Sequence, residues 1–276
     1  MNTILSALTT RTRPLVMGVV NVTPDSFSDG GHFDTREAAL EHAMTLVAQG
    51  ADILDIGGES TRPGADFVPV EQELERTIDL IAAIRARSAI PISIDTRKPE
   101  VASAAMAIGA NCWNDVSALS FSPDSIATAV ALAVPVILMH AKGDPKIMQD
   151  APSYVDVTGE VLNFLVSRMG QAVQAGLSID NILVDPGIGF GKNLDHNLTL
   201  MRDLKRFAAL GRPLVFGASR KRFIAGLDKG ADVSQRLGGS LAAALWAADH
   251  GAAILRVHDV AETVQALAVR AAILAD

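Results

Sequence analysis

"DILDIGGESTRPGADFVPVEQELERTIDLIAAIRARSAIPISID", residues 52–95, is the stretch that decides the fold. It opens and closes with short apolar segments rich in isoleucine, residues 52–58 and 91–95, which are typical of buried strands. Between them, one face of a helical pattern collects Leu74, Ile78, Ile81 and Ile84. A strand, an amphipathic helix and a second strand predict a unit of two parallel strands joined by a covering helix.

The same pattern extends in both directions along the chain. We predict eight strands, in residues 15–20, 52–58, 91–95, 111–115, 135–140, 181–187, 213–219 and 253–259. Helical segments separate them, including residues 234–248, where one face holds Leu237, Leu241 and Leu245. Helix starts are indicated by Asp34 with Glu37, by Asp259 with Glu262, and by Pro99.

Eight strands and eight helices in strict alternation predict an α/β fold, a single (β/α)8 TIM barrel. We expect residues 1–276 to form one domain, with residues 1–13 as a short N-terminal extension. A doubly wound open sheet is the alternative.

The composition narrows the class of protein. The chain has 24 Lys and Arg against 31 Asp and Glu, so it lacks the basic surface that nucleic acid requires. Its longest apolar run, residues 129–139, is too short to span a membrane. A single cysteine, Cys112, suits a reducing compartment and is expected to be a packed core residue. We therefore expect a cytoplasmic protein that binds neither nucleic acid nor membranes.

Polar side chains stand at nearly every predicted strand end. They are Asn21, Asp55 with Glu59, Asp95, Asn114 with Asp115, His140, Asp185, Ser219 with Lys221, and Arg256 with His258. The carboxyl ends of the strands form the active-site face of such a barrel, so these side chains should converge on one mouth. One such residue alone is more often a turn or helix cap, but a whole ring needs a ligand or mutual contacts.

The residue types in this ring indicate the ligand. Asp95, Asn114 and Asp185 suit an N–H fork such as the edge of a guanidine-like heterocycle. Arg256, His258, Lys221 and Asn21 supply donors for an anion such as a phosphate. A tight metal cage made of protein alone is not indicated, whereas Mg²⁺ held jointly by a substrate diphosphate and one or two protein oxygens fits.

Two glycine-rich loops and one polar loop follow strands. "DPGIGFGK", residues 185–192, fails the dinucleotide spacing but could bring backbone and Phe190 against a flat ligand. "GGESTRPGA", residues 57–65, offers Thr61 and Arg62 as donors. "NVTPDSFSDGG", residues 21–31, is a long polar segment around Phe27.

The chain resembles the bacterial dihydropteroate synthase family, from about residue 14 to the C-terminus. The resemblance rests on these loops together with "SIDTRKPEV", "NDVSAL", "LMH…GDPKIMQ", "GASRKRFI", "RLGGSLAAA" and "LRVHDV", in family order. It implies a pterin-binding (β/α)8 barrel that is usually a homodimer. It also implies a transferase of folate biosynthesis that condenses 6-hydroxymethyl-7,8-dihydropterin diphosphate with p-aminobenzoate, and a target of sulfonamides.

The resemblance also assigns roles to residues. The pterin would be bound by Asp95, Asn114, Asp185 and Lys221. Arg256, Val257 and His258 would meet the pterin ring and the diphosphate, and Asn21 would bind Mg²⁺ and the diphosphate. The remaining substrate-binding positions are Phe27, Thr61, Arg62, Pro63, Phe190, Ser219 and Arg222. Some family members have Ser in place of Arg222, so how the p-aminobenzoate carboxylate is held stays open.

The expected mechanism is ionisation first. The diphosphate leaves the pterin methylene, helped by Mg²⁺, Asn21, Arg256 and His258, while Asp95 and Asp185 favour positive charge on the ring. Residues 21–31 would then act as a lid that excludes water from the cation. Two alternatives are a folate-binding methyltransferase barrel and a pterin-binding paralogue without catalysis.

Overall fold

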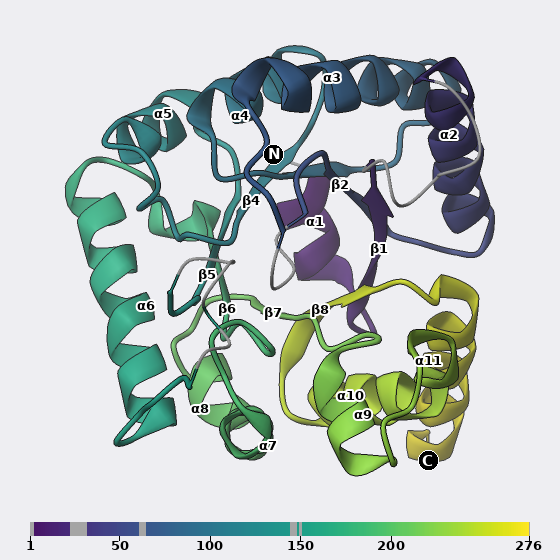
Figure 1. Cartoon of the computed structure of the whole chain (residues 1–276), viewed down its shortest axis with the longest axis vertical. Helices are drawn as coiled ribbons and strands as arrows, with labels where there is room; N and C mark the ends of the chain where they lie inside the picture. The colour runs from purple at the N-terminus through teal and green to yellow at the C-terminus, as the bar shows by residue number, and fades with distance from the viewer. Residues whose placement is uncertain (1–2, 23–31, 61–64, 144–147, 149–150, 276) are drawn as a thin grey trace.

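Eight parallel strands close into a barrel in the order β1 to β8, with β8 pairing back onto β1 (Figure 1). The structure is a computed structural model and describes residues 3–22, 32–60, 65–143, 148 and 151–275. The strands are β1 (Leu15–Asn21), β2 (Ile53–Gly57), β3 (Ile92–Asp95), β4 (Cys112–Asp115), β5 (Val136–Met139), β6 (Ile182–Asp185), β7 (Leu214–Phe216) and β8 (Ala252–Val257). The predicted strands and the predicted barrel are confirmed, and the open sheet is wrong.

The helices that follow the strands form a ring outside them (Figure 1), and one further helix precedes β1. They are α1 (Thr3–Thr10), α2 (His32–Ala48), α3 (Val70–Arg87), α4 (Pro99–Ala107), α5 (Ser125–Leu132), α6 (Val157–Gln174), α7 (Leu194–Arg202), α8 (Leu204–Ala208), α9 (Arg222–Leu227), α10 (Leu237–Asp249) and α11 (Val260–Leu274). Strict alternation is therefore wrong. Two helices follow β6, two follow β7, and α1 precedes the barrel.

Alternate residues of each strand face opposite sides of the barrel wall. Val16 and Val20 of β1 pack in the layer between strands and helices, whereas Met17 packs inside the barrel. In the same way Trp113 faces the helices and Cys112 faces inward. This period of two is the ordinary geometry of a strand, and it fixes which strand-end side chains can reach the mouth.

Residues at the start of the chain cover the end of the barrel at which the strands begin. Ile4 and Leu8 of α1 are buried in one cluster with the inward residues Met17, Ile53 and Leu183. In Figure 1, α1 lies within the outline of the ring of strands. The segment expected as a short extension thus covers the N-terminal end of the barrel with an apolar face, which leaves the opposite end as the mouth.

Helix α10 corrects the predicted core face. Its buried residues are Ser240, Ala243, Ala244 and Ala247, whereas Leu237 is 36% exposed. Small side chains let the helix lie close to β8, whereas the leucines border this face, with Leu245 partly buried against the core and Leu237 exposed. In α3 the predicted face holds better, with Ile81 and Ile84 fully buried.

Two of the three predicted helix starts are confirmed: Pro99 begins α4, and Asp259 is the residue before α11. Among the described residues, however, the Asp259 side chain makes no capping hydrogen bond. The third start changes, because α2 begins at His32, before Asp34. In the part of the chain described, none of the helices is long and apolar enough to cross a membrane.

Candidate active site

Six polar side chains share the inward register at the C-terminal end of the barrel. Each lies two residues beyond an inward residue of its own strand: Asn21, Asp55, Asp95, Asn114, Asp185 and Arg256. The strand pairing places Asn21 beside Gly57, Gly57 beside Asp95, and Asp95 beside Asn114. The sequence pattern therefore produces one polar layer on top of an apolar barrel interior.

Arg256 lies at the centre of this layer. Its Nε donates to Asp55 Oδ2 at 2.6 Å, and its Nη2 donates to Asp95 Oδ2 at 2.7 Å. Asn114 Nδ2 also donates to Asp55 Oδ2, at 3.2 Å. Asp55 is completely buried, and its carboxylate fixes the side chains of Arg256 and Asn114. Among the described residues, Asp95 Oδ1 and Asp55 Oδ1 lack hydrogen-bond partners, which leaves buried acceptors for a ligand.

Burial governs the charges of this layer. It raises the pKa of Asp95 to about 7, although the positive charge of Arg256 opposes the shift. It also raises the pKa of Asp185, against the charge of Lys221 and the hydrogen bond from Gly187. Burial alone would lower the pKa of Arg256, but the charges of Asp55 and Asp95 raise it above its ordinary value. The guanidinium is thus a fixed cation, and it lies beside a carboxyl group, Asp95, whose pKa is raised to about 7.

Lys221 forms the wall next to Asp185. Its Nζ donates to the carbonyl of Ile188 and lies 4.6 Å from the centre of the Phe190 ring. Burial lowers the pKa of Lys221 to about 8, although the charge of Asp185 opposes this. The Phe190 ring is thereby held against a cation at the edge of the site.

Glycines allow the loop after β6 to pass close to its neighbours. Gly187 has φ of +69°, and a Cβ there would lie 1.8 Å from the carbonyl oxygen of His140. Its N–H donates to Asp185 Oδ1 at 2.7 Å. Only glycine fits this position, and the turn it makes orients the Asp185 carboxylate.

Ser219 and His258 connect the ends of β7 and β8. The Ser219 hydroxyl oxygen accepts from the backbone N–H of His258 at 3.2 Å and lies 3.1 Å from His258 Nδ1. Val257, between Arg256 and His258, packs with the layer between strands and helices, so only its backbone faces the mouth. Arg222 begins α9 and is exposed.

A hollow of about 150 Å³, open to solvent, adjoins this layer on the side of β4 to β6. Phe190, Arg97, Ser117 and Phe164 are among the residues that line it. Phe190 therefore separates the polar layer from a second, less charged space.

Comparisons with known proteins agree with this geometry. The family model described as "Pterin binding enzyme" matches residues 17–258. The dihydropteroate synthase of Escherichia coli (strain K12) is 48% identical over 256 residues, which are 93% of this chain and 90% of that protein. The chain belongs to the dihydropteroate synthase family.

Solved structures of the family superpose on the whole barrel. Xanthomonas albilineans dihydropteroate synthase with 4-aminobenzoic acid has a TM-score of 0.91 at 52% identity, covering 96% of this chain and 94% of that one. The same organism's enzyme in complex with 7,8-dihydropteroate has a TM-score of 0.87 at 47% identity, covering 98% of each chain. Yersinia pestis dihydropteroate synthase with a sulfonamide drug has a TM-score of 0.90 at 42% identity, covering 95% and 94%. The predicted family and its transferase activity are confirmed.

Some residues of the predicted ring do not reach the mouth. Asp115 and His140 lie out of the inward register, and Glu59 lies beyond the end of β2. Both Asp115 oxygens accept backbone N–H groups, from Ser117 at 2.7 Å and Leu119 at 2.8 Å. His140 Nδ1 lies 2.9 Å from Nζ of the buried Lys192, and burial lowers the pKa of His140 to about 3. These groups shape loops rather than line the ring.

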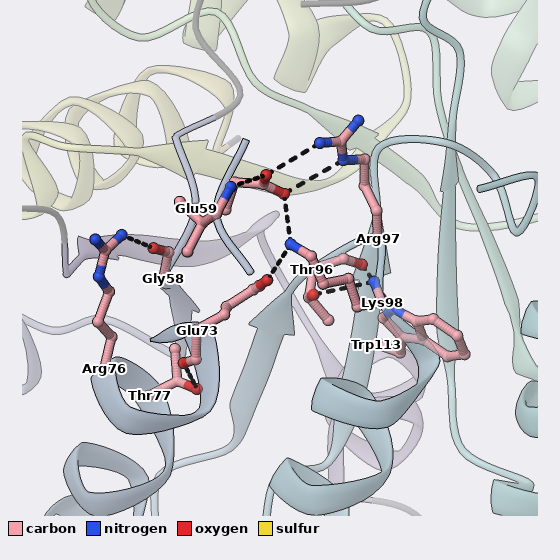
Figure 2. A network of polar contacts seen from close by, with 10 residues as sticks. Gly58, Glu59, Glu73, Arg76, Thr77, Thr96, Arg97, Lys98 and Trp113 are labelled. Carbon is pink, nitrogen blue, oxygen red and sulfur yellow. Dashed lines mark hydrogen bonds and ion pairs between the residues drawn. The ribbon is translucent and has the colours of Figure 1, made fainter. Parts of the chain in front are cut away.

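Glu59 belongs instead to a buried ion network beside the mouth (Figure 2). Lys98 Nζ lies 3.0 Å from Glu59 Oε2 and 2.5 Å from Glu73 Oε2, and Lys98 is only 1% exposed. Arg97 makes a second ion pair with Glu59 at 3.1 Å. The backbone N–H of Val68 donates to Glu59 as well. The network joins the end of β2, the start of α3 and the segment that follows Asp95.

Four predicted site residues, Phe27, Thr61, Arg62 and Pro63, lie outside the described residues. Conversely, the structure gives Asp55 a role that the sequence did not predict: the sequence placed it in the ring of strand-end residues without a function. The signal was present, because Asp55 follows the inward Ile53 by two residues, as Asp95 follows Ser93. What the sequence could not supply was its contact with Arg256, which lies 201 positions away.

Proposed function

We propose that this chain joins 6-hydroxymethyl-7,8-dihydropterin diphosphate to p-aminobenzoate and releases 7,8-dihydropteroate and diphosphate. The observation on which this rests is the buried acceptor set of Asp95, Asn114 and Asp185 at the ends of β3, β4 and β6. The relatives from Xanthomonas albilineans, solved with 4-aminobenzoic acid and with 7,8-dihydropteroate, support the choice of substrates.

The pterin would bind with its N–H edge against the carboxyl groups. Asp95 Oδ1 is buried and, within the described chain, unpartnered, so it can accept a hydrogen bond without displacing another. Lys221, opposite Asp185, would donate to a ring acceptor. Each hydrogen bond to a charged group is worth roughly 1.5–3 kcal/mol, so this set could hold the ring in one orientation.

The reaction would begin by ionisation. The bond between the pterin methylene carbon and the diphosphate oxygen breaks, and its electron pair stays on the oxygen. Asp95 and Asp185 stabilise the positive charge that spreads into the ring. The nitrogen lone pair of p-aminobenzoate then forms the new C–N bond, and the amine gives up a proton to the departing diphosphate or to solvent. The cation at Arg256 and the imidazole of His258 would stabilise the leaving group.

Mg²⁺ would be held in part by Asn21. Its amide oxygen is a hard ligand at the end of β1. Gly57 lies between Asn21 and Asp95 in the strand pairing, and a Cβ there would be in ordinary contact with Asn21 Oδ1. Among the described residues, no three His, Cys, Asp or Glu side chains group as a metal site. The donor set therefore fits a metal shared with the substrate diphosphate, where it would neutralise charge on the leaving group. Chelation should abolish turnover but leave the melting temperature of the ligand-free protein unchanged; a large drop would contradict this assignment.

p-Aminobenzoate would lie against Phe190, with its carboxylate toward Arg222. Arg222 is exposed at the first position of α9, next to Lys221. We expect Arg222→Ala to raise KM for p-aminobenzoate and leave KM for the pterin diphosphate unchanged; equal effects on both would remove Arg222 from this role. Sulfonamides would compete for the same place, a proposal supported by the Yersinia pestis enzyme, which was solved with a sulfonamide drug.

The protein would act in the cytoplasm as a homodimer. Exposed apolar side chains gather on α9 to α11, with Leu227 61%, Trp246 44% and Ile273 76% exposed. These helices lie together at one side of the barrel (Figure 1). Light scattering should give the mass of two chains, and Ile273→Glu should weaken the association. A monomeric wild-type protein would contradict the proposal.

Product formation tests the proposed function. Purified protein, both substrates and Mg²⁺ should yield dihydropteroate, detected by chromatography, and Asp185→Asn should not. A paralogue that only binds pterin would show the pterin complex in calorimetry without product. A methyltransferase-type barrel would bind a folate without using p-aminobenzoate.

A further inference from the structure

Arg220 stands between two site residues, Ser219 and Lys221, but its own side chain leaves the mouth. Its Nε donates to Asp259 Oδ2 at 3.1 Å and its Nη2 to Asp259 Oδ1 at 2.5 Å. This is the two-pronged pairing that gives an arginine–carboxylate contact its directional strength. Asp259 directly follows His258.

The backbone of Arg220 is in the left-handed region, with φ of +58°. That conformation is unfavourable for a residue with a Cβ, and it persists only where the surroundings impose it. Here the surroundings hold both backbone groups: the N–H donates to Ser240 Oγ at 2.9 Å, and the carbonyl accepts from Arg236 Nη1 at 2.9 Å. The left-handed residue turns the chain so that its two neighbours reach the site.

Two successive residues of the loop between β7 and α9 thus pair with two successive residues of the loop between β8 and α11. Ser219 pairs with His258 on the inner side, and Arg220 pairs with Asp259 on the outer side. Asp259 lies where a carboxylate would ordinarily cap a helix, yet within the described chain its side chain makes no capping bond to α11. Its carboxylate is committed to Arg220 instead.

We propose that Arg220 and Asp259 are positioning residues, which set Lys221, Ser219 and His258 for the dihydropteroate synthase reaction by locking the β7–α9 loop to the β8–α11 loop. The proposal rests on the proposed function. Neither residue touches the substrates. Their effect on turnover passes through the backbone of the neighbouring site residues.

The test is a double-mutant cycle with chemical rescue. Arg220→Ala and Asp259→Ala should each lower kcat at least tenfold, and the double variant should be no worse than either single one. Guanidinium at millimolar concentration, compared with equal NaCl, should restore a measurable part of kcat to Arg220→Ala, because Arg220 is 39% exposed and its removal opens a site beside Asp259. It should not rescue Asp259→Ala.

Arg270 and Asp249 provide a matched control. They form a fork-like pair between α11 and α10, with Arg270 Nε 2.7 Å and Nη2 2.6 Å from Asp249 Oδ1, outside the polar layer. Arg270→Ala should leave kcat unchanged and be insensitive to guanidinium. If an alanine variant fails to fold, Arg220→Lys and Asp259→Asn take its place, and each should lower kcat while KM for the pterin diphosphate stays near wild type.

The outcomes separate positioning from stability and from the proposed function. Lower melting temperatures with unchanged kcat, or additive effects in the cycle, would overturn the proposal and leave a structural ion pair. The histidine NMR signal of His258, assigned with His258→Gln, should shift in Arg220→Ala and return with guanidinium; an unmoved signal would also overturn it. Wild-type protein without any turnover would instead contradict the proposed function.

Discussion

Arg256 Nε lies 2.6 Å from Asp55 Oδ2, so the cation at the centre of the site is fixed by a carboxylate that is itself completely buried. Asp55 also accepts from Asn114, and it therefore links a proposed pterin ligand to the proposed diphosphate ligand. Removing its charge would direct the whole guanidinium charge toward Asp95 and loosen Asn114.

We predict that Asp55→Asn folds but binds the pterin diphosphate roughly 10- to 100-fold more weakly, the equivalent of one charged hydrogen bond of about 1.5–3 kcal/mol. Calorimetry measures the affinity, and a melting curve checks the fold. The matched control is Asp115→Asn, a buried carboxyl outside the polar layer that should cost stability rather than affinity. Unchanged affinity in Asp55→Asn would show that Asp95 alone is enough to hold the Arg256 guanidinium in place.

Asp185→Ala should abolish measurable pterin binding. The substitution removes a charged acceptor, strands the ligand N–H groups that it served, and takes away the partner of Gly187 N–H. The affinity for the pterin diphosphate should fall by at least the roughly 10- to 100-fold expected for Asp55→Asn. An affinity equal to wild type, measured on folded protein, would exclude Asp185 from the site.

The sequence predicted much of this site because strand geometry is local. A side chain two residues beyond an inward residue of the same strand must also face inward, and this rule places Asp95, Asn114 and Asp185 together. The same rule explains why His140, which is out of register, lies elsewhere. Contacts between distant segments follow from no local rule, so the pairing of Arg256 with Asp55 and of Arg220 with Asp259 could not be predicted.

Helix faces were harder to predict than strands. Helix α10 presents both a leucine stripe and a stripe of small residues, and hydrophobicity alone selects the leucines. The barrel instead buries Ala243, Ala244 and Ala247, because small side chains allow the closest packing on β8. Of the leucines, Leu245 is only partly buried against the core and Leu237 is exposed.

The pH dependence of kcat/KM for the pterin diphosphate should be bell-shaped, with its maximum between about pH 7 and pH 8. As the pH falls through about 7, Asp95 takes up a proton and loses its acceptor charge. As the pH rises through about 8, Lys221 loses its proton and its donor charge. Lys221→Arg should remove the alkaline limb and keep the acid limb. A wild-type profile that is flat from pH 6 to pH 9 would contradict both assignments.

Lys98→Met should be strongly destabilising. Figure 2 shows Lys98 between Glu59 and Glu73. The variant would leave both carboxylates buried, with Glu59 still paired with Arg97 and Glu73 without its ion pair to Lys98. Breaking a buried ion pair in this way costs roughly 3–5 kcal/mol of unfolding free energy. For a chain of this size the melting temperature should fall by roughly 5–15 °C. Lys142→Met removes an exposed lysine from its 3.6 Å pair with Glu160 and should change stability by no more than about 1 kcal/mol.

The destabilisation of Lys98→Met should shrink as the pH falls. In the wild type, burial already raises the pKa of Glu73 despite Lys98, whereas the hydrogen bonds from Val68, Arg97 and Lys98 outweigh burial and lower the pKa of Glu59. Without Lys98 both folded-state values should lie higher than in the wild type. A carboxyl group with a raised pKa binds more protons in the folded than in the unfolded state, so its penalty is present at neutral pH and is relieved as the pH falls through that pKa. Melting curves of both proteins from pH 7 to pH 4.5 should therefore converge; a gap that stays constant would mean that the lost lysine acted by packing alone.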